Sequence, residues 1–135
     1  MNAKDLSLLV VDDQHGVRRL LQEVFAEDGY RVRAASGGEE ALKMIAQEVP
    51  DLILLDIKMP GMSGLKTLAE LRKTNAGLPV LMMTAYGDLE VVGQVKKLGV
   101  KHYIIKPFDL SEVRHMVKGL LIEAGPGAGK VQEIG

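Results

Sequence analysis

The chain has 135 residues, of which 47% are hydrophobic and 26% charged, a balance typical of one folded domain and not of a disordered chain. Its 17 basic and 18 acidic residues leave a formal net charge of −1, so we expect no broad positive surface for nucleic acid or for an anionic membrane. The lack of cysteine excludes disulfides, thiolate metal sites and cysteine nucleophiles, and agrees with a cytoplasmic location.

Short apolar segments, which we predict to be strands, alternate along the chain with longer segments of helical period. The first apolar run, Leu8 to Val11, is too short for a signal-peptide core or a membrane span, so no membrane contact is expected. Four of the five segments are almost continuously apolar, as in strands buried on both faces of a parallel sheet. The second alternates with arginines and is expected at an edge. The predicted strands are Leu6–Val11, Tyr30–Ala35, Leu52–Leu55, Val80–Met83 and His102–Ile105.

Apolar residues between the predicted strands recur with the period of an amphipathic helix. Two such stripes are clear, and their members are Val17, Leu20, Leu21, Val24 and Phe25 in the first and Val113, Met116, Val117, Leu120 and Leu121 in the last. Capping boxes are predicted where the spacing fits, at Ser36 with Glu39 and at Asp109 with Glu112. Helix ends are predicted at Gly29 and Gly99.

Five strands that alternate with five helices predict right-handed crossovers and an α/β fold with helices on both faces of the sheet. For this length we expect a doubly wound, flavodoxin-like, five-stranded parallel sheet in the order 2-1-3-4-5. The predicted domain covers residues 5–123. A glycine-rich sequence follows, and we expect a flexible tail over residues 124–135.

Polar residues follow four of the predicted strands at the point where each strand ends. The first strand is followed by Asp12 and Asp13, the third by Asp56, the fourth by Thr84 and the fifth by Lys106. In an open α/β sheet this carboxyl edge is where ligands bind. Any one aspartate is explained equally well as the start of a loop or a helix cap, but that explanation does not account for all five residues at one edge.

Three carboxylates that meet at one edge repel one another, so their arrangement calls for a cation. Oxygen ligands favour Mg²⁺, and Mn²⁺ is a possible substitute. With a metal bound, a carboxylate is a suitable nucleophile toward a phosphoryl group and forms an aspartyl phosphate. Lys106 would then neutralise one phosphoryl oxygen and Thr84 would donate a hydrogen bond to another.

Four motifs together resemble the signature of the response-regulator receiver family over roughly residues 6–121. They are Val11-Asp12-Asp13, the segment from Leu54 to Gly64, Met83-Thr84-Ala85-Tyr86 and Lys106-Pro107-Phe108. The resemblance implies that Asp56 accepts the phosphoryl group, that Asp13 binds the metal directly and Asp12 through water, and that the main-chain carbonyl of Lys58 is a further ligand. It also implies a cis bond before Pro107, and a conformational switch through Thr84 and Tyr103.

Within the family the chain is most similar to stand-alone receivers of sporulation phosphorelays, although His15 and Tyr103 replace a tyrosine and a histidine of that pattern. The similarity implies a sensor histidine kinase and a histidine phosphotransferase as partners, and self-catalysed phosphorylation and dephosphorylation in place of conventional turnover. It also implies a docking face for the partner helices, made of Gln14, His15, Gly16, Val17, Leu20, Pro107 and Phe108. Val17 and Leu20 are equally well explained as core residues.

Other functions fit the sequence less well. A phosphohydrolase of the haloacid dehalogenase type needs a carboxylate where Lys58 stands, and residues 124–131 imitate a P-loop but lack its first glycine and its hydroxyl. The three histidines have no zinc-ligand spacing. The main alternative is the receiver domain of a larger response regulator, which would control an attached output domain such as a DNA-binding domain.

Overall fold

A parallel sheet forms the centre of the computed structural model, which describes residues 6–85 and 91–123. Its strand order is β2-β1-β3-β4-β5, which confirms the predicted doubly wound fold. The strands are β1 (Ser7–Val11), β2 (Arg31–Ala35), β3 (Leu52–Asp56), β4 (Val80–Thr84) and β5 (His102–Ile105). The helices are α1 (His15–Glu27), α2 (Gly38–Gln47), α3 (Gly64–Thr74), α4 (Val92–Lys97) and α5 (Leu110–Glu123). Each strand begins and ends within one residue of its predicted bounds.

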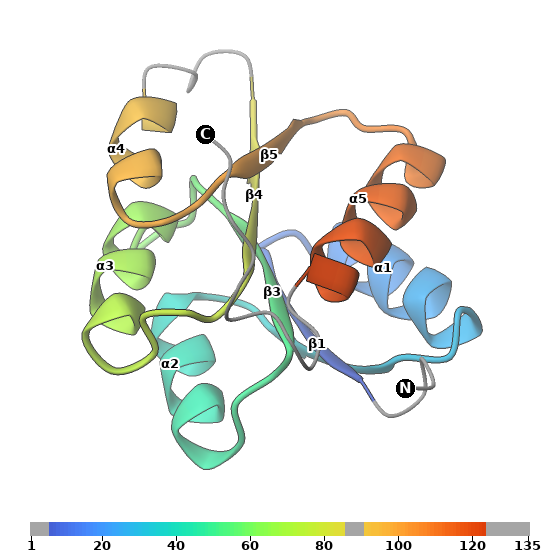
Figure 1. The fold of residues 1–135 in the computed structure, drawn as a ribbon, viewed down its shortest axis with the longest axis horizontal. Coiled ribbons are helices and arrows are strands. Elements are labelled where there is room, and N and C mark those ends of the chain that lie inside the picture. Colours follow the sequence, from blue (N-terminus) through green and yellow to red (C-terminus); the bar gives the residue numbers. More distant parts are fainter. Residues whose placement is uncertain (1–5, 86–90, 124–135) are drawn as a thin grey trace.

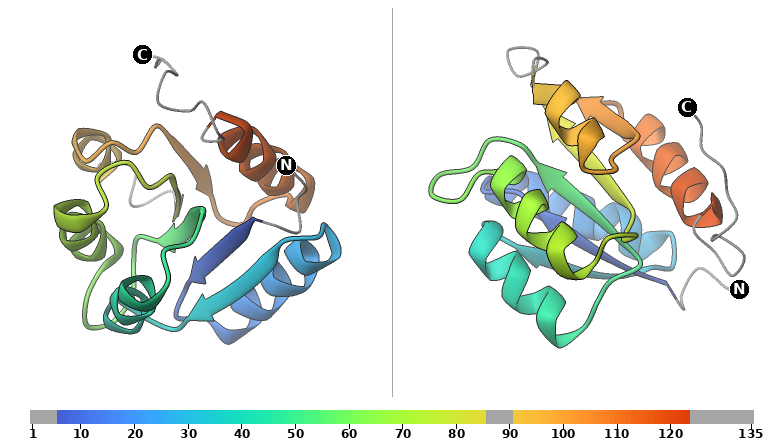
Figure 2. Two further views of the ribbon diagram at one scale, coloured as in Figure 1. Left: turned by 60° about the horizontal axis from the view of Figure 1, so that its bottom comes forward. Right: turned by 60° about the vertical axis from the view of Figure 1, so that its left-hand side comes forward.

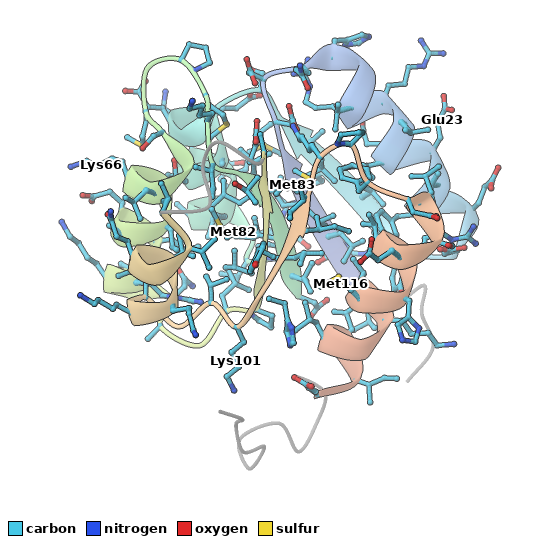
Figure 3. The ribbon with its side chains drawn as sticks, turned by 90° about the horizontal axis from the view of Figure 1, so that it is seen from above. Glu23, Lys66, Met82, Met83, Lys101 and Met116 are labelled. Atoms are coloured by element: carbon cyan, nitrogen blue, oxygen red, sulfur yellow. The ribbon has the colours of Figure 1, made fainter. Side chains whose placement is uncertain are left out.

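Helices cover both faces of the sheet and divide the core into two clusters. Helices α1 and α5 lie on one face, and α2, α3 and α4 lie on the other (Figures 1 and 2). Because side chains of a strand alternate between faces, neighbouring residues enter different clusters. In β4, Met82 packs in the cluster that contains Leu68 and Leu71 of α3, whereas Met83 packs in the cluster with Phe25 of α1 (Figure 3).

The two edge strands differ from the three buried central ones. Strand β2 lies at an edge, as its arginines predicted. Strand β5 lies at the other edge, with His102 and Tyr103 exposed, so the prediction that it is buried on both faces was wrong. Apolar composition does not reveal this, because the place of β5 at the end of the sheet leaves part of the strand uncovered. Within β5, Ile104 alone is buried.

The helix ends only partly follow the predicted signals. Gly29 and Gly99 have φ of 98° and 85°, the left-handed conformation that glycine adopts easily, which confirms both as helix ends. Neither predicted capping box forms as expected. Ser36 donates its N–H and hydroxyl to Glu40, at 2.7 and 3.0 Å, in place of a reciprocal pair with Glu39.

The second expected box is replaced by a shorter-range interaction. The carboxylate of Asp109 accepts hydrogen bonds from the N–H and hydroxyl of Ser111, at 2.9 and 2.8 Å, while the N–H of Glu112 bonds to the main-chain carbonyl of Asp109. In the part of the chain that the structure describes, no helix is long and apolar enough to cross a membrane. The predicted tail at 124–135, its P-loop imitation and Tyr86 lie outside the described residues.

Candidate functional site

The carboxyl ends of β1, β3, β4 and β5 bring all five predicted polar residues to one edge of the sheet. Asp12 follows β1, Asp56 and Thr84 are the last residues of β3 and β4, and Lys106 follows β5. The main chain ties these ends together, because the N–H of Lys106 bonds to the carbonyl of Thr84 at 2.6 Å. The site is therefore assembled by the parallel pairing of strands that are far apart in the sequence.

Three carboxylates form the acidic part of the site. One oxygen from each of Asp12, Asp13 and Asp56 lies within 4.8 Å of the other two, a separation at which all three could hold one ion. Asp12 and Asp56 are buried, at 0% and 6% exposure, while Asp13 is exposed. Two carboxylates are thus held in the protein and the third faces solvent, as expected for a cation site that is open on one side.

Lys106 is the cation that lies among these carboxylates. Its Nζ donates to Oδ2 of Asp12 at 2.6 Å and lies 3.4 Å from Oδ2 of Asp56. The other oxygen of Asp12, Oδ1, accepts the N–H of Gln14 at 2.9 Å. This ammonium offsets one of the three carboxylate charges.

Burial and the neighbouring carboxylates both change the pKa of Asp56. Burial is the main cause that raises its pKa from 3.8 to about 6, and the charges of Asp12 and, to a lesser degree, Asp13 act in the same direction. Lys106 opposes the shift without cancelling it. A second positive charge at the site would favour the ionised carboxylate.

Thr84 and the bond before Pro107 complete the site. Thr84 is buried at the end of β4, next to Met83, which pairs with Asp56. Its hydroxyl donates to the adjacent carbonyl of Ala85 at 3.2 Å. The Lys106–Pro107 peptide bond is cis, as predicted. The side chain of Lys58 is exposed, and the role of its main-chain carbonyl as a ligand stays a prediction.

Sequence reasoning assigned no role to Gly64, which shapes the loop after Asp56. A Cβ atom at Gly64 would lie 2.0 Å from the main-chain oxygen of Asp56, and its N–H bonds to the carbonyl of Ile57 at 2.7 Å. Only glycine permits this close approach. Its place in the Ser63-Gly64 pair at the start of α3 was the available signal, but the sequence does not show which backbone it approaches.

The remaining predicted residues lie around the site at different depths. Tyr103 on β5 is 39% exposed and its switch role stays a prediction. In the predicted docking face, Leu20 is 42% exposed and is therefore no core residue, whereas Val17 and Phe108 are partly buried against the α1–α5 core cluster. The exposed members are Gln14, His15, Gly16 and Pro107.

The fold and this acidic edge define a receiver. Residues 8–118 match the response regulator receiver domain family, so the chain belongs to that family and is a receiver domain of two-component signalling. It is 44% identical over 121 residues to sporulation initiation phosphotransferase F of Bacillus subtilis, a match that covers 90% of this chain and 95% of that protein.

Longer regulators and solved receivers are also similar. The chain is 41% identical over 114 residues to regulatory protein AtoC of Escherichia coli, which covers 84% of this chain but 25% of that protein. The crystal structure of response regulator protein TrrA from Thermotoga maritima, in complex with Mg²⁺-BeF, has a TM-score of 0.76 and 37% identity, covering 85% of this chain and 98% of that one. The chain therefore resembles both single-domain receivers and the receiver part of larger proteins.

Proposed function

We propose that this receiver takes a phosphoryl group onto Asp56 in a reaction that requires Mg²⁺ (or Mn²⁺), and that it passes the group on within a phosphorelay. The observation that carries the proposal is the cluster of Asp12, Asp13 and Asp56 with Lys106 beside it. Buried hard oxygen ligands, an open side and the raised pKa of Asp56 fit a divalent cation of the magnesium type.

The donor chemistry assigns the metal to the three carboxylates. Asp13 is exposed and supplies a direct ligand, while Asp12, already bonded to Gln14 and Lys106, acts through water. The carbonyl of Lys58 completes the protein ligands in this proposal. A bound Mg²⁺ offsets negative charge on the phosphoryl oxygens.

The transfer itself exchanges one bond to phosphorus for another. An Oδ atom of Asp56 attacks the phosphorus, a P–O bond forms, and the P–N bond of a phosphohistidine breaks as its imidazole takes up a proton. Lys106 stabilises one phosphoryl oxygen by charge, and the Thr84 hydroxyl turns from Ala85 to donate to another. Tyr103 changes its exposure in response, which would transmit the state of the site to the surface of β5.

The proposed partners are a sensor histidine kinase as the donor and a histidine phosphotransferase as the acceptor, in the cytoplasm. Similarity to sporulation initiation phosphotransferase F along 95% of that protein favours the relay. The predicted docking face, at the start of α1 and at Pro107 and Phe108, is in keeping with a relay, because five of its seven residues are exposed.

The second candidate is a receiver that controls an attached output domain, as the match to a quarter of regulatory protein AtoC suggests. A transfer assay separates the two: the phosphorylated chain is incubated with histidine phosphotransferases of the same organism. Transfer of the phosphoryl group from Asp56 to a partner histidine supports the relay. Retention of the phosphoryl group on Asp56 with every such partner favours the regulator.

The phosphorylation step is tested by intact-mass measurement of the chain with acetyl phosphate and Mg²⁺. We expect one added phosphoryl group, which is absent in EDTA and absent in the Asp56→Asn variant. Equal incorporation by wild type and Asp56→Asn would refute Asp56 as the acceptor.

A further inference from the structure

Arg18, on the first turn of α1, contacts the main chain directly after β1, where Asp12 and Asp13 lie. Its Nη1 donates to the main-chain carbonyl of Asp12 at 2.8 Å, and its own N–H bonds to the carbonyl of Gln14 at 3.1 Å. Its Nη2 lies 3.5 Å from Nδ1 of His15. The guanidinium therefore joins the start of α1 to the peptide between the two metal-site aspartates.

The orientation of that peptide sets the position of Asp13 after the end of β1. A peptide unit is planar, so a donor that holds the carbonyl oxygen of Asp12 also holds the N–H and Cα of Asp13. On the other side of Asp12, its N–H bonds to the carbonyl of Ala35 at 3.2 Å. Both main-chain polar groups of Asp12 are thus held, one by β2 and one by Arg18.

An acid on α2, Glu40, lies close enough to Arg18 to interact with its charge. The bonds from Ser36 are the main cause that lowers the pKa of Glu40, and the positive charge of Arg18 lowers it further. Glu40 is fixed at the end of β2 by those two bonds from Ser36. This negative charge therefore has a fixed position directly after β2, the strand that neighbours β1.

We infer that Arg18 is a positioning residue for the metal site, and that it acts through the carbonyl of Asp12 to hold Asp13 toward the cation. The inference rests on the proposed Mg²⁺ site and assigns a role to a residue that does not itself touch the metal or the phosphoryl group.

The sign of the effect distinguishes positioning from simple charge. A guanidinium beside a cation site repels Mg²⁺, so removal of its charge alone would tighten Mg²⁺ binding. Removal of a positioning contact loosens the ligand and weakens binding, and loss of such outer contacts typically costs about 10–100-fold in metal affinity. We expect the lower end, about 10-fold, for Arg18→Ala because the contact is to main chain and not to a ligand side chain.

The test measures Mg²⁺ affinity of the full chain by isothermal titration calorimetry for wild type, Arg18→Ala, Arg18→Lys and Arg19→Ala. Arg19 is the matched control, because it is exposed and pairs with Glu23 at 3.1 Å on the outer side of α1. We expect about 10-fold weaker binding in Arg18→Ala, partial recovery in Arg18→Lys, and no weakening in Arg19→Ala.

A kinetic measurement shows whether any loss is general damage. With acetyl phosphate, the Mg²⁺ concentration for half-maximal phosphorylation of Arg18→Ala should rise about as much as its dissociation constant, about 10-fold. The rate at saturating Mg²⁺ should stay near the wild-type rate. Unchanged or tighter Mg²⁺ binding by Arg18→Ala overturns the inference, as does a lower saturating rate with an unchanged half-maximal concentration. If wild type binds no Mg²⁺, the proposed function fails and the inference fails with it.

Discussion

The Asp56→Asn variant should be more stable than the wild-type protein in the absence of metal. The raised pKa of Asp56, about 6 against 3.8, means that the folded protein holds this proton more tightly than the unfolded chain does. As pH rises from about 4 to about 6 the unfolded chain ionises first, so the wild type loses stability over that range and does not regain it.

The magnitude follows from the two pKa values. At about 1.4 kcal/mol per pKa unit, the difference between 3.8 and about 6 corresponds to about 3 kcal/mol above pH 7. An asparagine of the same size carries no charge at any of these pH values. Its advantage should therefore be close to zero near pH 4 and grow toward about 3 kcal/mol at neutral pH.

The free energies of unfolding of the wild type and of Asp56→Asn are measured by urea unfolding in EDTA, followed by far-UV circular dichroism. The measurement is repeated at several pH values from about 4.5 to 8. Glu27→Gln, which removes one negative charge at an exposed position of α1, is the control and should stay within about 0.5 kcal/mol of wild type throughout. Added Mg²⁺ should reduce the advantage of Asp56→Asn, because it stabilises the wild type by binding. The reasoning is refuted if the advantage of Asp56→Asn is the same at pH 4.5 and at pH 7.5, or absent at both.

Three further perturbations test the site and its supports. Lys106→Ala should bind Mg²⁺ but accept phosphoryl groups from acetyl phosphate on the order of 100-fold more slowly, because its charge is needed on the phosphoryl oxygens; a wild-type rate would exclude that role. Gly64→Ala should lower the free energy of unfolding by about 3 kcal/mol or more, because its methyl group would lie 2.0 Å from the main-chain oxygen of Asp56. The control is Gly119→Ala, whose Cβ meets nothing within 4 Å and which should raise the free energy of unfolding by about 0.5–1 kcal/mol. Equal effects of the two substitutions would contradict the packing explanation. Arg72 donates to the main-chain carbonyls of residues 75, 78 and 98. Arg72→Lys should therefore lower the free energy of unfolding in urea by about 1–3 kcal/mol, since one ammonium does not serve all three acceptors. A loss under about 0.5 kcal/mol would show that water replaces the lost bonds.

The fold was readable from the sequence because its signals are local. Continuous apolar runs such as Leu52 to Leu55 predict buried parallel strands, and their alternation with helical stripes predicts the sheet order. The same reasoning was wrong for β5, whose apolar residues resemble those of a central strand. Burial depends on what covers a strand, and composition does not carry that information.

The site was predictable in its members and less so in its interactions. A strand end is a position in the sequence, so Asp12, Asp56 and Lys106 could be placed at one edge before the structure was known. The 2.6 Å contact between Lys106 and Asp12, however, joins residues 94 apart, and the raised pKa of Asp56 follows from burial among those neighbours.

The amino-acid sequence by itself determined the receiver fold and the five polar residues of the site, since both follow from spacing along the chain. Only the tertiary structure showed that Arg18 holds the carbonyl of Asp12, that Ser36 bonds to Glu40 and not Glu39, and that Gly64 approaches the backbone of Asp56. The contacts of Arg18 and Gly64 depend on how α1 and the loop after β3 fold back on the strand ends, which spacing along the chain does not specify. The choice between Glu39 and Glu40 depends on the turn that the chain makes between β2 and α2.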